Sequence, residues 1–351
     1  MPDLTPLEQL LDQGVARGVA PAVTLLLWKG ERPLATLAAG QGRPDTIYDL
    51  ASLTKCLATA PLALQLREAG RLGWDRPLGE MWGRAVPPDK ADITPRQLLT
   101  HAAGLPAYRP YHELLLKYSP TMRRGLLKSM LMNEPLAHAP GALALYSDLG
   151  YLLLGLVLEE TAGAYLEALL PGLYRSLGVE GPCFLPLDRE LPWPRERVAP
   201  CGPLPGRPVV HGQVEDENAF ALGGVAGHAG LFGTAGQVAS VMDSLVRAAR
   251  GGGPWDAATG RELFRRDPSL PGSPRTPGFD TPTGRDSAAG PNAPQGTVGH
   301  LGFTGVSLWW HPLSRQGVVL LTNRVALGRG NLQIRDFRRQ VHELSWPLLG
   351  Q

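Results

Sequence analysis

The chain has few cysteines and no long apolar run, and both shortages restrict what it can be. Its three cysteines, Cys56, Cys183 and Cys201, are widely spaced. They form neither a zinc-binding spacing nor a disulfide framework, so we expect reduced thiols. No apolar stretch approaches the roughly 20 residues of a membrane-spanning helix, and no basic segment with an apolar core follows Met1. The sequence therefore predicts a cytoplasmic protein without membrane contact.

An excess of charge of one sign is also lacking. The 34 Lys and Arg residues nearly balance the 32 Asp and Glu residues, and the two signs are interspersed. Without a basic stripe or an alternation of basic and aromatic residues, we expect no nucleic-acid partner. The acidic run at residues 215–217 has no histidine or cysteine at ligand spacing, so we expect no metal and no other cofactor.

Glycine and proline are abundant, with 43 and 34 residues, which indicates many loops in a chain of 351 residues. Strand patterns occur near both ends of the chain and helical patterns fill the middle, which together indicate an α+β fold. We expect a single unit with an α/β part at about residues 1–50 and 215–351 and a helical part at about 51–214. The expected strands are 22–28, 33–39, 305–310 and 317–322, and the expected terminal helices are 5–16 and 331–349.

A helix predicted over residues 52–69 carries the first candidate site. Ser52 and Lys55 lie three residues apart, which places both on one helix face. A serine hydroxyl becomes a strong nucleophile when a base removes its proton, and a lysine one turn away can do so if burial lowers its pKa. The alternative for this motif taken alone is a capping serine beside a solvated lysine. Pro61 cannot donate to the Leu57 carbonyl, which predicts a kink downstream of the motif.

Two further motifs lie far along the chain. Tyr146-Ser147-Asp148 opens a helix predicted from residue 148, and a tyrosine of ordinary pKa ~10 acts as a base only where positive charge favours its phenolate. Alternatively, Asp148 is an N-cap and Tyr146 a core residue. Residues 299–305, Gly-His-Leu-Gly-Phe-Thr-Gly, precede a predicted strand. Free backbone N–H groups at such a glycine-rich strand edge can hold an oxyanion.

In their order and separation, S-x-x-K at Ser52, Tyr146-Ser147-Asp148 and His300-Leu301-Gly302 resemble the motifs of the serine β-lactamase and penicillin-binding protein superfamily. The likeness spans residues 47–323. It is greatest for the branch that holds class C β-lactamases, D-alanyl-D-alanine carboxypeptidases and related esterases. The resemblance implies a β-lactamase/transpeptidase-like fold, in which an antiparallel sheet flanked by terminal helices joins an all-helical subdomain.

The resemblance also implies roles for individual residues. Ser52 would be the nucleophile that forms an acyl-enzyme, Lys55 would help to remove its proton, and Tyr146 would be the partner base. The backbone N–H groups of Ser52 and Phe303, beside Gly302, would form an oxyanion hole, which contributes about 2.7–4 kcal/mol per donor.

Two positions depart from the family pattern. Asp148 stands where asparagine is usual; it can accept a hydrogen bond from Lys55 but cannot donate one to a substrate carbonyl. His300, which we expect to line the cleft, stands where penicillin-recognising members carry the lysine of K-T-G. A histidine of ordinary pKa ~6.5 is mostly neutral at pH 7. We therefore expect poor affinity for the carboxylate of a β-lactam or of a D-Ala-D-Ala peptide.

Three features outside the motifs also bear on the site. His228, in a glycine-rich loop, either faces the cleft or hydrogen-bonds its own loop, and both interpretations stay open. His101 is expected to be structural, tethering the loop that follows its helix. Residues 266–295 are rich in Pro, Gly and Ser, which predicts a mobile surface loop.

The sequence thus favours a serine hydrolase, an esterase or amidase on small acyl substrates. One alternative is a β-lactamase or D-alanyl-D-alanine carboxypeptidase, and another is a non-catalytic, penicillin-binding-like ligand sensor. The expected partner is a small ester, amide or β-lactam. His300 and the lack of an export signal count against the first alternative, and the intact Ser52, Lys55 and Tyr146 count against the second. The acyl group, the leaving group and the oligomeric state stay open at this point.

Overall fold

The computed structural model describes residues 2–204, 206–207, 210–284 and 286–350. At its centre lies an antiparallel sheet with the strand order β2-β1-β8-β7-β6. The first two strands come from the start of the chain and the other three from its end, as predicted. Their bounds are β1 Ala22–Lys29, β2 Arg32–Gly40, β6 Val298–Leu301, β7 Ser307–His311 and β8 Gln316–Thr322.

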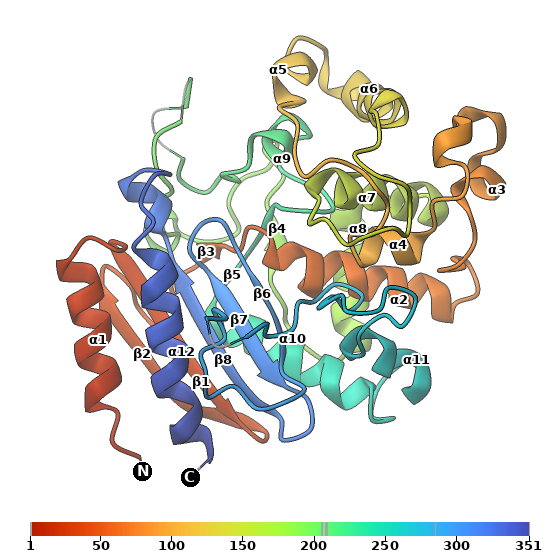
Figure 1. Ribbon diagram of the computed structural model, residues 1–351. Coiled ribbons are helices and arrows are strands. Elements are labelled where there is room, and N and C mark those ends of the chain that lie inside the picture. The colour runs from red at the N-terminus through yellow and green to blue at the C-terminus, as the bar shows by residue number, and fades with distance from the viewer. Residues whose placement is uncertain (1, 205, 208–209, 285, 351) are drawn as a thin grey trace.

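Helices cover both faces of this sheet. The terminal helices α1 (Thr5–Ala16) and α12 (Ile334–Gly350) lie side by side on one face, and α10 (Ala235–Ala248) packs on the other (Figure 1). Strand β1 is apolar along nearly its whole length because successive side chains enter two different cores. Leu25 packs into the core under α1 and α12, and its neighbour Leu26 packs into the core that contains α10.

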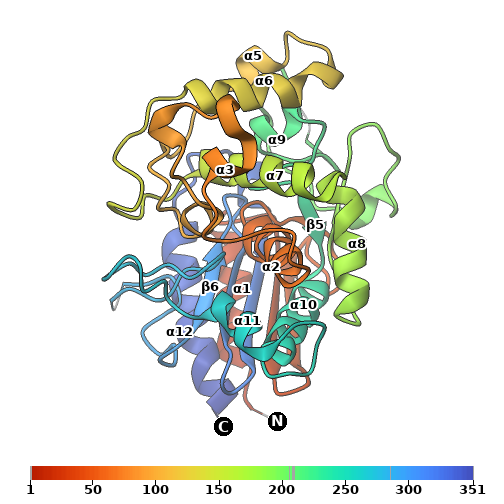
Figure 2. The ribbon, with the colours of Figure 1, turned by 90° about the vertical axis from the view of Figure 1, so that its right-hand side faces the viewer.

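The middle of the chain supplies most of the helices, and Figure 2 shows α3, α5, α6 and α7 above the sheet and its covering helices. Helix α7 is the central one, with residues 149–158 all buried. The bounds of the helices from the middle of the chain, and of the short helices α9 and α11 that follow, are α2 Ala60–Glu68, α3 Leu78–Trp82, α4 Pro95–Leu99, α5 His112–Leu115, α6 Pro120–Asn133, α7 Asp148–Ala162, α8 Leu166–Ser176, α9 Glu217–Ala221 and α11 Ala257–Arg261.

Among the described residues, no single helix is long and apolar enough to cross a membrane. Helices α7 and α8 have the length and composition of a membrane span only when taken together, and they are bent by 77° relative to each other.

A second, small sheet joins the two parts of the molecule. Its strands are β3 (Tyr48–Asp49), β5 (Leu231–Gly233) and β4 (Cys183–Phe184), with β5 in the middle. The Leu50 N–H continues the pairing by donating to the Leu231 carbonyl at 2.9 Å. The chain leaves this sheet and enters the turn that carries Ser52.

The irregularity predicted at Pro61 lies one turn earlier than expected. Residues Lys55–Thr59 form a π-helical turn, and the Ala60 N–H donates to the Lys55 carbonyl. The expectation that Lys55 would precede the distortion is therefore wrong. The Leu57 carbonyl, which Pro61 cannot reach with an N–H, accepts a hydrogen bond from the Tyr174 hydroxyl at 3.1 Å instead. A side chain of α8 thus satisfies the group that the proline leaves without its helical donor.

Two segments near the end of the chain differ from expectation. Residues 298–301 form β6, a strand that the sequence did not predict because its glycines weaken the pattern. The described residues of the segment 266–295, which leave out 285, lie in no helix or strand, as expected for a loop, yet Phe279 and Ala289 are almost fully buried. Asp280 pairs with Gly299 through two backbone hydrogen bonds of 2.7 and 2.9 Å, which fasten this loop to the free edge of β6.

The Tyr174 hydroxyl should stabilise the fold measurably. Tyr174→Phe leaves the buried Leu57 carbonyl without a partner, so we expect the free energy of unfolding to fall by about 1–3 kcal/mol in urea titrations. Tyr165→Phe, at an exposed tyrosine just before α8, is the control and should change it by less than about 0.5 kcal/mol. Equal effects of the two substitutions would contradict this role for the hydroxyl.

Candidate active site

A buried carboxylate shapes the turn that presents Ser52. Asp49 accepts one hydrogen bond from the Ala51 N–H at 2.8 Å and another from the Glu215 N–H at 2.7 Å. Burial raises the pKa of Asp49 to about 7. Ala51 has a φ of 46°, in the left-handed region that is unfavourable for a residue with a Cβ. The backbone immediately before the serine is therefore held in a strained conformation, a feature that often marks functional sites.

Lys55 lies directly beneath Ser52 and is fully buried. Its Nζ donates to Ser52 Oγ at 3.0 Å, to Asp148 Oδ1 at 2.7 Å and to the His228 carbonyl at 3.1 Å, which uses all three ammonium protons. Burial alone would lower the pKa of Lys55, but the nearby Asp148 and Tyr146 outweigh it and raise the pKa above its ordinary value. The condition under which Lys55 would act as the base, a pKa lowered by burial, is therefore not met, because Asp148 compensates the buried charge.

Tyr146 contacts the same serine from the other side. Its hydroxyl donates to Ser52 Oγ at 2.9 Å, and Lys55 Nζ lies 5.1 Å from the centre of its ring. Burial raises the pKa of Tyr146, and the negative charge of Asp148 acts in the same direction, while the positive charge of Lys55 and the hydrogen bond to Ser52 oppose them. The predicted gathering of these three side chains around one hydroxyl is present. Their roles in a reaction stay a prediction.

The start of α7 places Tyr146 and Asp148. Ser147 is the N-cap, and its Oγ accepts from the Gly150 N–H at 3.0 Å and donates to the Pro106 carbonyl at 2.6 Å. The alternative in which Asp148 was the cap and Tyr146 a core residue is therefore wrong. Since Ser147 fills the cap, Asp148 at the first helical position is free to pair with Lys55.

The turn between β6 and β7 brings Phe303 close to Ser52. A Cβ on Gly302 would lie 3.0 Å from the Leu50 carbonyl oxygen and 3.2 Å from the Ala51 Cβ, so only glycine allows this approach. Among hydrogen bonds within the described chain, neither the Ser52 nor the Phe303 backbone N–H donates to a protein group. Two free N–H groups beside a serine hydroxyl form an arrangement that could hold an oxyanion.

Two cavities, of about 440 and 350 Å³, meet at Ser52. Both are lined by Ser52, Asp148, Phe303 and Arg329. The larger one extends along β6 and α12 and is rich in arginine, whereas the smaller one extends towards α9 and is rich in carboxylates. The serine therefore lies where a positively charged half of the cleft adjoins a negatively charged half.

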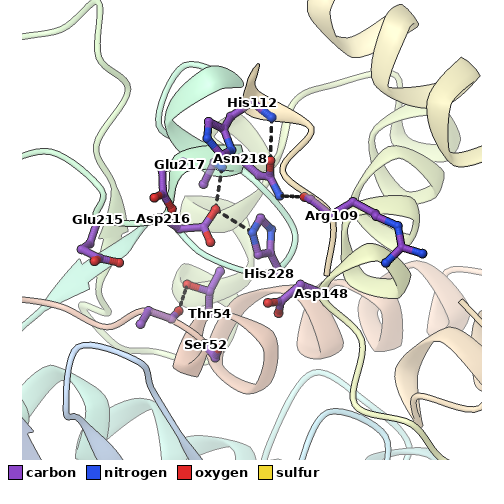
Figure 3. A network of polar contacts seen from close by, with 12 residues as sticks. Ser52, Thr54, Arg109, His112, Asp148, Glu215, Asp216, Glu217, Asn218 and His228 are labelled. Atoms are coloured by element: carbon purple, nitrogen blue, oxygen red, sulfur yellow. Dashed lines mark hydrogen bonds and ion pairs between the residues drawn. The ribbon is translucent and has the colours of Figure 1, made fainter. Parts of the chain in front are cut away.

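His228 lines the smaller cavity. Ser52, Asp148, His228 and Asp216 border the same space, as Figure 3 shows. His228 Nε2 lies 2.8 Å from Asp216 Oδ1. Burial opposes the charge of Asp216, but the contact with His228 holds the pKa of that carboxyl well below its usual range. Of the two interpretations that the sequence left open, the structure supports the first: His228 faces the cleft, and its ring pairs with Asp216 at the start of α9 instead of with its own loop.

Two buried imidazoles flank the Tyr146 ring. His101 and His300 have ring centres 4.5 and 5.9 Å from that of Tyr146. His101 Nδ1 accepts from the Ser147 N–H at 3.0 Å, so this residue is structural, as predicted, and holds the segment that carries Tyr146. His300 lines the larger cavity, in agreement with its expected place in the cleft. Burial, aided by nearby cations, lowers the pKa of both, for His300 to about 3.

Sequence reasoning missed several residues that line the cavities, among them Arg275, Asp280 and Arg329. Arg275 and Asp280, both from the loop at 266–295, form an ion pair at 3.2 Å, and the Arg275 guanidinium lies 5.4 Å from the Tyr146 ring centre. Arg329 forms ion pairs with Glu215 and Glu217, each at 2.6 Å. No local pattern marks these residues, since they reach the site only through tertiary packing. In the part of the chain that the structure describes, no group of three or more His, Cys, Asp or Glu residues is arranged to hold a metal ion.

Comparison with known proteins gives a consistent result. The family model described as beta-lactamase matches residues 7–343. A protein from Escherichia coli K12, named as a candidate D-alanyl-D-alanine carboxypeptidase, is 30% identical over 306 residues, covering 80% of this chain and 69% of its own. Two solved structures share the fold at a TM-score of 0.68. EstCE1, a hydrolase with promiscuous acyltransferase activity, is 22% identical (95% of this chain, 98% of its own), and a Streptomyces D-stereospecific amidohydrolase is 20% identical (92% and 94%).

The carboxylate of Asp148 should set the pH dependence of the site. In Asp148→Asn, burial is no longer opposed by this negative charge, so the pKa of Lys55 falls and the Lys55–Tyr146 pair can release a proton at lower pH. We expect the acidic limb of kcat/KM for p-nitrophenyl acetate to move to lower pH by on the order of one unit. Asp75→Asn, which removes an exposed ion pair with Arg96, is the control. A limb that stays in place or moves to higher pH would contradict this dependence.

Proposed function

Because the chain belongs to the beta-lactamase family and is a hydrolase of that fold, we propose that Ser52 is its nucleophile and forms an acyl-enzyme with small esters or amides. The observation that carries the proposal is the pair of hydrogen bonds to Ser52 Oγ, from Lys55 at 3.0 Å and from Tyr146 at 2.9 Å. A ligand sensor without catalysis would require neither the buried cation nor the phenol beside this hydroxyl.

Acylation starts once the Lys55–Tyr146 pair has released one proton to solvent. The Lys55 ammonium then stabilises the Tyr146 phenolate against the effect of burial. The phenolate, which now accepts the hydrogen bond that the phenol donated, takes the proton of Ser52 as Oγ attacks the substrate carbonyl carbon. The new Oγ–C bond pushes the carbonyl electrons onto oxygen, where the N–H groups of Ser52 and Phe303 stabilise the negative charge. When the tetrahedral species collapses, the bond to the leaving group breaks and Tyr146 returns the proton to the departing oxygen or nitrogen.

Deacylation repeats these steps with water in place of serine. Tyr146 takes a proton from the attacking water, the acid product forms, and the proton returns to Ser52 Oγ. Asp148 touches no reacting atom in this scheme and acts through Lys55, whose ammonium it holds beneath the serine at 2.7 Å. The carboxylate at this position therefore replaces the usual amide contact to substrate with a stronger hold on the lysine.

A D-alanyl-D-alanine carboxypeptidase or a β-lactamase is the second candidate. The name of the Escherichia coli relative favours the former. The arginines along the larger cavity also give it a positive potential that attracts anions. Against both activities stands His300, because a neutral imidazole replaces the cation that would contact the substrate carboxylate. We therefore place esters and small amides first.

The nucleophile can be identified by covalent labelling. A fluorophosphonate probe should add once per chain, and Ser52→Ala should abolish the adduct seen by intact-protein mass spectrometry. Tyr146→Phe and Lys55→Met should each lower kcat for p-nitrophenyl esters roughly 10³-fold or more, because the proton of Ser52 then has no acceptor. Ser119→Ala, at an exposed serine, should behave as the unmodified protein. An adduct that persists in Ser52→Ala would exclude this serine as the nucleophile.

The two candidate activities differ in their response to a cation at residue 300. His300→Lys should raise kcat/KM for nitrocefin about tenfold or more, because a hydrogen bond to a charged group contributes about 1.5–3 kcal/mol. His311→Lys, on the neighbouring strand and outside the cavity, should leave it unchanged. Rapid nitrocefin turnover by the unmodified protein, with no gain in His300→Lys, would instead favour the second candidate.

A further inference from the structure

His300 holds a polar atom that the protein itself does not use. The side chain is 4% exposed and lies on β6, where it lines the larger cavity together with Ser52 and Tyr146. Its Nε2 has no hydrogen-bond partner among the described residues. Buried polar atoms are nearly always hydrogen-bonded, because leaving one unpaired is unfavourable. An unpaired nitrogen in the wall of a cavity beside a nucleophile is available to a ligand.

The hydrogen bond of the other ring nitrogen, Nδ1, determines whether Nε2 can donate or accept a hydrogen bond. His300 Nδ1 lies 2.7 Å from the Leu301 carbonyl oxygen. A carbonyl oxygen only accepts hydrogen bonds, so Nδ1 carries the proton. In a neutral ring, Nε2 is then a bare acceptor with its lone pair directed away from Leu301.

The surroundings keep this ring neutral. Burial disfavours the imidazolium first, and the charges of Lys55, Arg275 and Arg338 act in the same direction; only the hydrogen bond to Leu301 opposes them. The cations come from three separate elements: the turn after Ser52, the loop at 266–295, and α12. The Asp280 carboxylate, which also lines the cavity, is paired with Arg275.

Building on the proposed acylation of Ser52, we propose that His300 Nε2 accepts a hydrogen bond from a neutral donor of the substrate, a hydroxyl or an amide N–H, and so selects substrates that carry one beside the scissile carbonyl. A carboxylate at this point would meet a lone pair instead of a cation. An ammonium group would meet the positive potential of the arginines along the same cavity. There Arg324 and Arg338 donate to backbone carbonyls and form no ion pair with a carboxylate of the described residues. A neutral donor avoids both conflicts.

Two substitutions separate the acceptor from the rest of the side chain. His300→Asn keeps a short side chain able to donate to the Leu301 carbonyl but places nothing at the position of Nε2. His300→Gln extends an amide oxygen towards that position and retains an acceptor there. If the role of His300 is only structural, the two variants will affect all substrates alike.

The test uses two pairs of esters that differ only in a donor. On the acyl side, the p-nitrophenyl ester of N-acetylglycine is compared with that of N-acetylsarcosine, in which a methyl group replaces the N–H. On the leaving-group side, 2-hydroxyethyl acetate is compared with 2-methoxyethyl acetate. For at least one pair, the unmodified protein and His300→Gln should prefer the donor about tenfold in kcat/KM, and His300→Asn should reduce the preference to near one.

The outcomes test the role of His300 separately from the proposed acylation of Ser52. A ratio near one for both pairs in the unmodified protein, or an equal ratio in His300→Asn, overturns the role of His300. If the acyl-Ser52 adduct is still detected by mass spectrometry in those cases, the proposed hydrolase survives and only this inference fails. If the unmodified protein forms no such adduct with any of the four esters, the proposed function fails and this inference fails with it.

Discussion

The site depends on a single buried ammonium group. Lys55 is fully enclosed, and such a charge is tolerable only because three acceptors, from the Ser52 turn, from the start of α7 and from the loop at His228, receive its three protons. The most distant of these acceptors, the His228 carbonyl, lies 173 positions from Lys55 in the sequence. The hydrogen bonds of this one cation therefore hold the small sheet, the helical part and the glycine-rich loop together around the serine hydroxyl.

The electrostatics around Tyr146 follow from the same group. The two imidazoles beside the phenol stay neutral because burial and the neighbouring cations disfavour their protonation. Lys55 and Arg275 place positive charges 5.1 and 5.4 Å from the centre of its ring. Arg275 is placed by its ion pair with Asp280, which is itself fastened to β6. A loop without helices or strands thus contributes to the charge balance of the site.

The C-terminal helix reaches the site through the turn after β6. Arg338 of α12 is buried and donates to the carbonyls of Gly302, Gly305 and Val306. These bonds hold the turn that carries the Phe303 N–H against the backbone before Ser52. Burial and the nearby Arg324 lower the pKa of Arg338 to about 9, which shows how strongly this position is desolvated. The position of the candidate oxyanion donor at Phe303 therefore depends on the packing of α12 against this turn.

The sequence alone determined the α+β class, most element positions and the identity of Ser52, Lys55 and Tyr146 as a group, because spacing within a helix and ordered motifs are local signals. It did not determine the charge state of Lys55, the π-helical turn at Lys55–Thr59, or the parts played by Arg275 and Arg329. Those depend on which groups the fold brings together: Asp148 reverses the effect of burial on Lys55, and Tyr174 relieves the missing donor of Pro61. A pKa or a backbone distortion in a buried site is set by neighbours in space, which only the tertiary structure supplies.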